Sequence, residues 1–184
     1  MKKLMIAAVA VAFAACAQAA SFSWKTSMSD KVYQPGTTTL LASATAYLFD
    51  ASTVTQASLV TAFANNTLDL TTGNISSQAI SSGAIANTVF EDGTAAGDTL
   101  SAYFATIVTI DSTDYLFISD AVAAAGQVGK TTPMQFNAKD ASQAAALDAT
   151  AGYSGAGWYA VPEPTSGLLL LLGMAGLALR RKQK

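Results

Sequence analysis

The chain has 184 residues, of which 51% are hydrophobic and 12% are charged, and its formal net charge is −2. It has no histidine and a single cysteine, Cys16, which excludes histidine-dependent triads, histidine-containing metal sites and an internal disulfide. Residues 20–160 carry four lysines against eleven acidic residues, a balance of −7 that argues against nucleic acid as a partner.

The N-terminus has the three parts of a secretory signal peptide. Lysines at positions 2–3 precede an apolar run over residues 4–16, and Ala17 and Ala19 then supply small residues at a cleavage site. The run is too short for a membrane anchor, because a spanning helix needs roughly 20 residues. We therefore predict a signal helix that signal peptidase removes after Ala19, with a cut after Ala20 as the alternative.

Cys16 raises the alternative of a lipoprotein. Phe13–Cys16 departs from a lipobox, because the first position of that motif is usually leucine or another aliphatic residue. The cleavage site at Ala19 competes with it. A cut there would leave a mature chain without a thiol.

The first half of the body predicts strands and one helix. Residues 22–24 resemble a short strand, a turn is predicted at 34–36, and residues 40–49 alternate as a strand does. Thr53 and Gln56 fit a capping box that opens a helix over 54–64, ending at Asn65–Asn66. Beyond it we expect a small hairpin over residues 68–75, and we interpret the near-copies 75–79 and 80–84 as low-complexity drift rather than a repeat.

The second half contains the strongest strand pair. Residues 100–110 alternate, 111–114 are expected to form a turn, and 115–118 begin the return strand. Asp140 and Gln143 fit a second capping box, which predicts a short helix to Leu147, and residues 155–159 suggest a last strand. The expected fold is mainly β, antiparallel and sandwich-like, with one or two short helices.

The C-terminal residues form a three-part tail. Pro162, Glu163 and Pro164 are expected to be extended, because each proline fixes φ and removes a backbone donor. An uncharged helix is predicted over residues 166–179, where the run from Gly167 to Leu179 measures about 20 Å and approaches the span of a hydrocarbon core only with snorkelling arginines. A basic anchor follows, which the positive-inside tendency keeps in the cytoplasm: Arg180, Arg181, Lys182 and Lys184.

This tail closely resembles the PEP-CTERM sorting signal of Gram-negative bacteria. The resemblance implies a substrate of an exosortase, a membrane-embedded cysteine transpeptidase, with cleavage at or near residues 162–164. It also implies a producer that makes exopolysaccharide and biofilm. The chain then divides into a signal peptide (1–19), an exported β-rich domain (20–160) and a sorting signal with a transmembrane helix (161–184).

The body offers weaker candidates for binding. Asp111 with Asp114, and Glu91 with Asp92, invite a calcium site, although turn chemistry explains acidic residues in such runs equally. Aromatic side chains could stack on sugar rings: Trp24, Trp158 and Tyr159 foremost, with Tyr33, Tyr103 and Tyr115. The Trp158–Tyr159 pair could instead anchor at the membrane interface.

We therefore expect a non-enzymatic exported protein without cofactor or metal. Its partners are expected to be signal peptidase, an exosortase, the membrane at the precursor stage, and polysaccharide. The precursor would lie in the inner membrane with a cytoplasmic C-terminus, and the mature form on the cell surface or outside, in a structural or adhesive role in biofilm. The alternative is a secreted carbohydrate-binding module or a small glycoside-active enzyme that uses two carboxylates across a groove.

Overall fold

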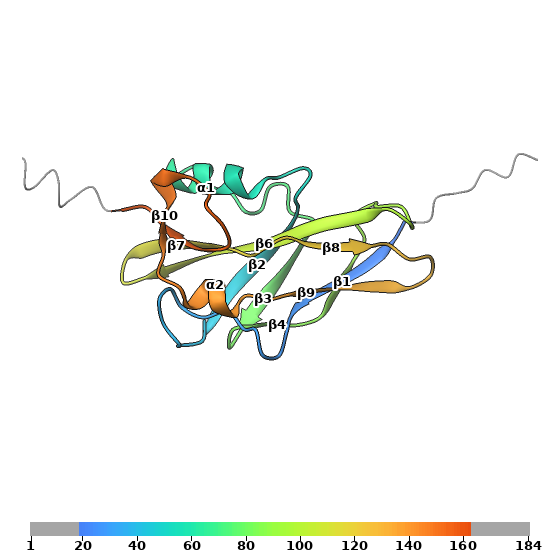
Figure 1. The fold of residues 1–184 in the computed structure, drawn as a ribbon, viewed down its shortest axis with the longest axis horizontal. Helices are drawn as coiled ribbons and strands as arrows, with labels where there is room; N and C mark the ends of the chain where they lie inside the picture. The colour runs from blue at the N-terminus through green and yellow to red at the C-terminus, as the bar shows by residue number, and fades with distance from the viewer. Residues whose placement is uncertain (1–18, 163–184) are drawn as a thin grey trace, which may run out of the picture.

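The computed structural model describes residues 19–162, an elongated body whose two chain ends lie at opposite ends of its long axis (Figure 1). Strands dominate it, with two short α-helices and one 3-10 turn. In chain order the elements are β1 (Ser21–Thr26), β2 (Ser43–Asp50), α1 (Gln56–Ala64), β3 (Ser76–Ser81), β4 (Ala84–Ile85), β5 (Thr88–Phe90), β6 (Thr99–Ile110), β7 (Thr113–Ile118), β8 (Val122–Ala125), β9 (Thr131–Phe136), α2 (Lys139–Gln143), β10 (Leu147–Asp148), η1 (Ala149–Ala151) and β11 (Gly157–Ala160).

The larger sheet has eight strands and occupies the middle of the body. Neighbouring strands follow the order β10-β11-β7-β6-β2-β3-β4, and β8 pairs with the first residues of β6. The 12-residue β6 is the organising strand, because it pairs with β2, β7 and β8. The outermost strands of this order, β10 and β4, have two residues each, which leaves little free edge for another chain to join.

The smaller sheet has the order β5-β1-β9. Its central strand β1 is antiparallel to β5 but parallel to β9, which lies more than 100 residues away in sequence. β10 and β11 are also parallel. Most strand pairs are antiparallel, as expected, but the antiparallel description is incomplete: both sheets are mixed, because strands distant in the chain meet in the same direction.

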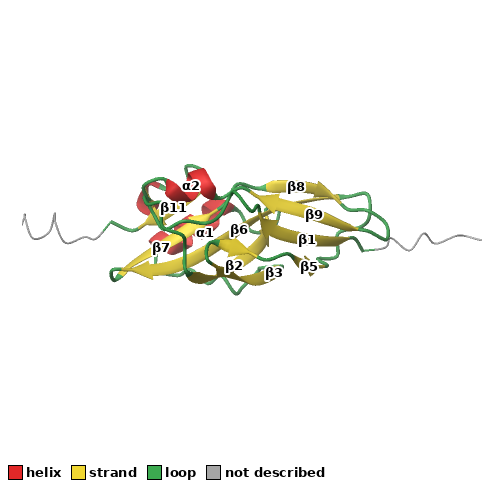
Figure 2. Ribbon diagram, turned by 90° about the horizontal axis from the view of Figure 1, so that it is seen from below, coloured by secondary structure: helices red, strands yellow, loops and turns green. Residues whose placement is uncertain are grey.

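Two separate cores cover the two faces of the larger sheet, because successive side chains of a strand point to opposite faces. Phe104 of β6 points to the first core, which it shares with the smaller sheet through Trp24 and Phe136. Tyr103 points to the second core, beneath α1 and η1. The body is thus a two-sheet sandwich with a helical cover on its outer face (Figures 1 and 2).

The strong hairpin predicted over residues 100–118 is confirmed as β6 and β7. The two strands pair without a break up to Ile110 and Thr113. Asp111 and Ser112 both have positive φ angles, 50° and 66°, which identifies a two-residue type I′ turn. The turn is shorter than expected, so Thr113 and Asp114 already belong to the return strand.

The predicted helix is present, but its cap differs. Thr55, not Thr53, is the N-cap, and its side chain accepts a hydrogen bond from the Ser58 backbone N–H at 3.2 Å. Thr53 instead donates its hydroxyl to the Asp50 carbonyl, and Gln56 donates its side-chain amide to the Ser119 carbonyl. The capping box fails because both of its members find partners outside the helix.

Two further local predictions are wrong. Residues 68–71 form no strand, and the hairpin in this region is instead made by β3 and β4, where Ile80 and Ser81 pair with Ile85 and Ala84. The helix after Asp140 begins at Lys139 and ends at Gln143, with Ala138 at its N-cap and no side-chain cap. Asp140 therefore lies inside the first turn, where its charge favours the helix N-terminus.

Among residues 19–162, no helix is long and apolar enough to cross a membrane. The predicted signal helix and the predicted transmembrane helix at residues 166–179 lie outside the described residues.

Candidate functional site

The chain leaves the body directly from its sheet. β11 lies between β7 and β10, and its last residue, Ala160, is paired with Tyr115 on one side and Asp148 on the other. Val161 packs against the second core, and Pro162 is exposed. The first residue of the predicted sorting motif therefore follows the folded body with no linker, while Glu163, Pro164 and the basic anchor lie outside the described residues.

A hollow of about 240 Å³ opens beside this exit. Its walls come from the C-terminal end of α1, from the β6–β7 turn and from Val161 itself; the lining residues are Phe63, Ala64, Asn66, Ser112, Thr113, Asp114 and Val161. Asp114 contributes the only acidic group of this lining, and its carboxylate accepts a 2.6 Å hydrogen bond from the Thr109 hydroxyl.

The three foremost candidates for sugar stacking are not available to a ligand, whereas Tyr33 and Tyr115 are half-buried. Trp24, Trp158 and Tyr159 each have 0% exposed surface. The indole N–H groups of the two tryptophans donate at 3.0 Å to the Ser76 hydroxyl and the Tyr33 carbonyl. These three aromatics are core residues, so both the sugar-stacking and the membrane-interface interpretations are wrong for them. The packed sheets cover the ring faces that a sugar or a membrane would have to contact.

Tyr159 has a local role that sequence reasoning missed. Its hydroxyl donates to the Gly155 carbonyl at 2.5 Å and accepts from the backbone N–H groups of Ser154 and Gly155. This side chain therefore holds the loop that leads into β11. The Gly-Tyr-Ser-Gly composition marks a turn, but only the fold shows that the next tyrosine organises it.

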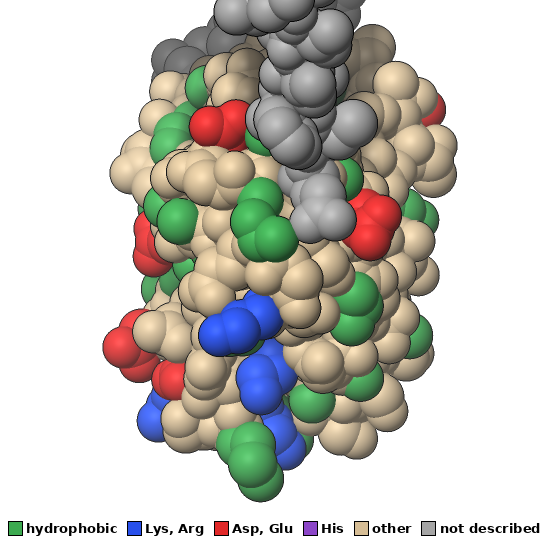
Figure 3. All heavy atoms as spheres, turned by 90° about the vertical axis from the view of Figure 1, so that its right-hand side faces the viewer, with side chains coloured by type: hydrophobic (Ala, Val, Ile, Leu, Met, Phe, Trp, Pro, Cys, Tyr) green, Lys and Arg blue, Asp and Glu red, His purple; other side chains and the backbone are tan. Residues whose placement is uncertain are grey.

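The N-terminal end of the body has its own hollow, of about 410 Å³, lined by Ala19, Ser21, Glu91, Gln127, Gly129, Lys130 and Thr131. Figure 3 shows this end, with basic side chains gathered on one part of it. Ala19 is exposed, whereas Ala20 is buried and donates its backbone N–H to the Thr94 carbonyl at 2.7 Å. A cut after Ala19 would keep this contact, and a cut after Ala20 would remove it; Ala17 lies outside the described residues.

Four acidic turns in the body follow one pattern, an aspartate whose carboxylate accepts from both the backbone N–H and the hydroxyl of the residue two positions later. The pairs are Asp50–Ser52, Asp69–Thr71, Asp92–Thr94 and Asp148–Thr150. Asp92, one of the residues considered for calcium, is thus occupied with turn formation. Within residues 19–162 no group of three or more potential metal-ligating side chains comes together.

These turns predict a pH dependence at Asp69. Hydrogen bonds from the Thr71 side chain first, then from Thr72, lower the pKa of Asp69 below its ordinary value. Because the pKa is lower in the folded state, the stabilisation is present above the unfolded pKa and is lost as pH falls through the folded pKa. We expect Thr71→Val to raise the Asp69 pKa toward its ordinary value, as measured by carboxyl NMR titration. The pKa of Asp148, held low by Thr150, serves as the internal control and should not move.

The fold and the exit together define a class of protein: a β-rich folded body that passes directly into a C-terminal processing segment. Comparison with protein families identifies that segment, because residues 160–182 match the PEP-CTERM protein-sorting motif. The chain therefore carries a sorting motif that implies an exported protein, a membrane-anchored precursor and an exosortase as partner. Comparisons with curated proteins and with solved structures returned no match for this chain.

Proposed function

We propose that this protein is a non-enzymatic structural or adhesive component of an extracellular polysaccharide matrix. Signal peptidase removes residues 1–19, the tail holds the precursor in the inner membrane with its basic end in the cytoplasm, and the exosortase then cuts near residues 162–164. The body is released or displayed at the cell surface. The observation that carries the proposal is the sorting motif at residues 160–182, joined without a linker to a folded body.

The surface of the body supports a matrix role over a catalytic one. The tryptophan and phenylalanine side chains of residues 19–162 are buried, the tyrosines are buried or half-buried, and the exposed turns present aspartate, serine and threonine. Each of the two hollows has one carboxylate in its lining, Asp114 or Glu91, whereas glycoside hydrolysis needs two facing carboxyl groups about 5–9 Å apart. The glycoside-active alternative therefore lacks a specific observation in its favour.

Mass spectrometry of the protein from surface and membrane fractions tests the processing. We expect the surface form to begin at Ala20 and to end between Pro162 and Pro164. The matched control carries Pro162→Ala and Pro164→Ala. Without the two fixed φ angles the segment is no longer held extended, so the intact chain should stay in the membrane fraction. An intact Lys184 in the surface fraction would contradict the proposed processing.

The matrix role has a separate test on the mature protein purified from the surface fraction. We expect retention on the producer's own polysaccharide and none on an unrelated neutral polysaccharide. If neither polysaccharide retains the protein, a polysaccharide-binding role is contradicted, while the result on processing still stands.

A further inference from the structure

The body is held rigidly up to the residue before the sorting motif. Ala160 is paired on both sides within the larger sheet, and Val161 packs against the second core. Pro162 is the first residue without such contacts. If an enzyme cleft binds the motif in extended form, the residues that precede the motif, Ala160 and Val161, remain held by the body.

The remaining chain is too short to keep the body away from the membrane. Residues 162–166 separate Val161 from the apolar run that begins at Gly167. Fully extended, this connection reaches about 20 Å, less than the length of β6. This step rests on the proposed function, in which the tail lies in the membrane.

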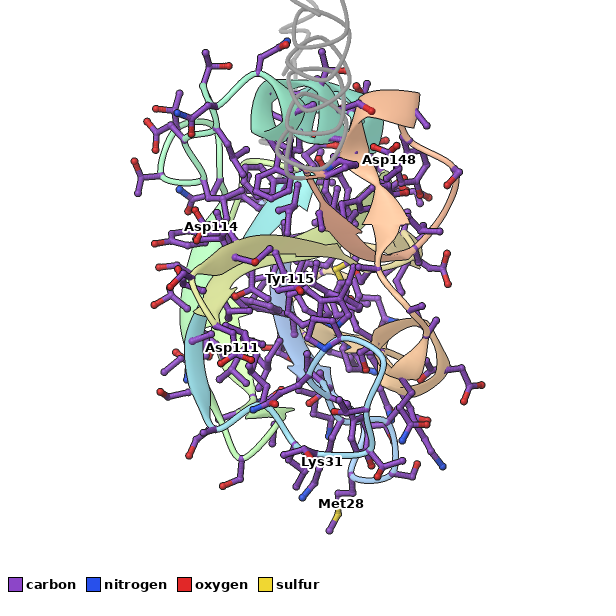
Figure 4. The ribbon with its side chains drawn as sticks, turned by 90° about the vertical axis from the view of Figure 1, so that its left-hand side faces the viewer. Met28, Lys31, Asp111, Asp114, Tyr115 and Asp148 are labelled. Carbon is purple, nitrogen blue, oxygen red and sulfur yellow. The ribbon has the colours of Figure 1, made fainter. Side chains whose placement is uncertain are left out.

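The end of the body from which the chain leaves must therefore lie near the membrane. Figure 4 views this end and shows Asp111, Asp114 and Asp148 around the point where the chain leaves. The turn residues Asp111 and Asp114 are exposed, and burying their charges in hydrocarbon would be costly. This end is consequently suited to contact with another protein rather than to insertion in lipid. The hollow beside Val161 provides a concave surface for such a contact.

We propose that the surface formed by the C-terminal end of α1 (residues 63–66), the β6–β7 turn (111–114) and Val161 is the docking surface for the membrane-embedded exosortase. The enzyme meets this surface when its cleft holds the motif, because the surface directly adjoins the residue that precedes Pro162. The opposite end, which contains the β8–β9 turn, then points away from the membrane (Figure 1).

Two matched insertions test the docking surface in the full-length precursor. A small folded domain is inserted between Asp111 and Ser112, or between Val128 and Gly129 in the β8–β9 turn. Both sites are exposed turns, where insertions are tolerated best. The rate at which the truncated form appears is measured by pulse-chase labelling, and the fold of both variants is checked by resistance to protease.

We expect the first insertion to slow truncation on the order of tenfold or more, because the motif can no longer be seated in the cleft, and the second to leave it unchanged. Ten Gly/Ser residues added between Val161 and Pro162 should restore the rate of the first variant. Equal rates for both insertions, or no recovery with the linker, would overturn the proposal. If the first insertion unfolds the body, Thr113→Trp takes its place, because a tryptophan fits a strand and would fill the same hollow. Its truncation rate should then fall and recover with the linker in the same way.

The unmodified precursor separates this proposal from the proposed function. If it is never truncated, the processing itself is refuted. If it is truncated at the normal rate and the insertions behave alike, only the docking surface is refuted.

Discussion

Trp158→Ala is expected to lower the free energy of unfolding by about 3–5 kcal/mol, as large-to-small substitutions of buried aromatics do. Trp158 has 0% exposed surface and packs against Tyr115 and Phe117, with ring centroids 6.4 and 5.2 Å away. The substitution leaves a cavity in the first core and removes the donor to the Tyr33 carbonyl. A loss of this size is a large share of the stability of a small domain, typically about 5–15 kcal/mol.

Urea unfolding followed by circular dichroism measures this effect on the mature protein. Trp158→Phe keeps most of the ring but lacks the N–H, so it should cost less than the alanine variant and more than a surface change. Val128→Ala is the surface control, since Val128 is 68% exposed, and should change stability by less than about 0.5 kcal/mol. A Trp158→Ala protein of normal stability that no longer binds polysaccharide would contradict the core assignment and return Trp158 to the surface.

Gly83→Ala is expected to be the most damaging of the turn substitutions. Gly83 has a φ of 72°, and a Cβ at this position would lie 2.5 Å from the Val32 carbonyl oxygen. That oxygen is backbone and cannot rotate away. The Gly83 N–H and carbonyl also bond to Leu41 and Val32, so the hairpin of β3 and β4 is tied to two other segments here.

Gly129→Ala is the matched control for this prediction. Gly129 has a similar φ of 66°, but a Cβ there meets nothing within 4 Å. The control should lose only the conformational cost, roughly 1–2 kcal/mol, and Gly83→Ala should lose that amount plus a steric cost of about 1–3 kcal/mol. Thermal unfolding of both variants measures the difference, and equal losses would show that the contact with Val32 relaxes freely.

Local sequence patterns predicted the elements whose cause is local. The hairpin of β6 and β7 follows from alternating residues before a turn, although that turn is shorter than predicted, and α1 follows from apolar residues at helical spacing before Asn65. The cap at Thr55 was missed because Thr53 and Gln56 have the spacing of a capping box. In the fold, however, their side chains donate to the carbonyls of Asp50 and Ser119 instead. A capping pattern cannot reveal a competing partner that lies 63 residues away.

The candidate site divides in the same way. The motif beginning at Pro162 could be recognised from residue types and order alone, and the family comparison confirms it. The direct passage from β11 to Pro162 could not, because it depends on the pairing of Ala160 with Tyr115 and Asp148. The status of Trp24 and Trp158 was equally hidden, since a tryptophan in a strand faces solvent or core according to which sheet covers it.

The sequence by itself determined the route of this protein, because an enzyme or a membrane reads the sorting signal as a short linear segment. The tertiary structure alone decided what that segment is attached to. The parallel pairing of β1 with β9, the second core under α1 and the burial of the aromatics all join residues far apart in the chain. Those contacts depend on packing and cooperative closure of two sheets, and they place a folded end of the body directly before the sorting motif.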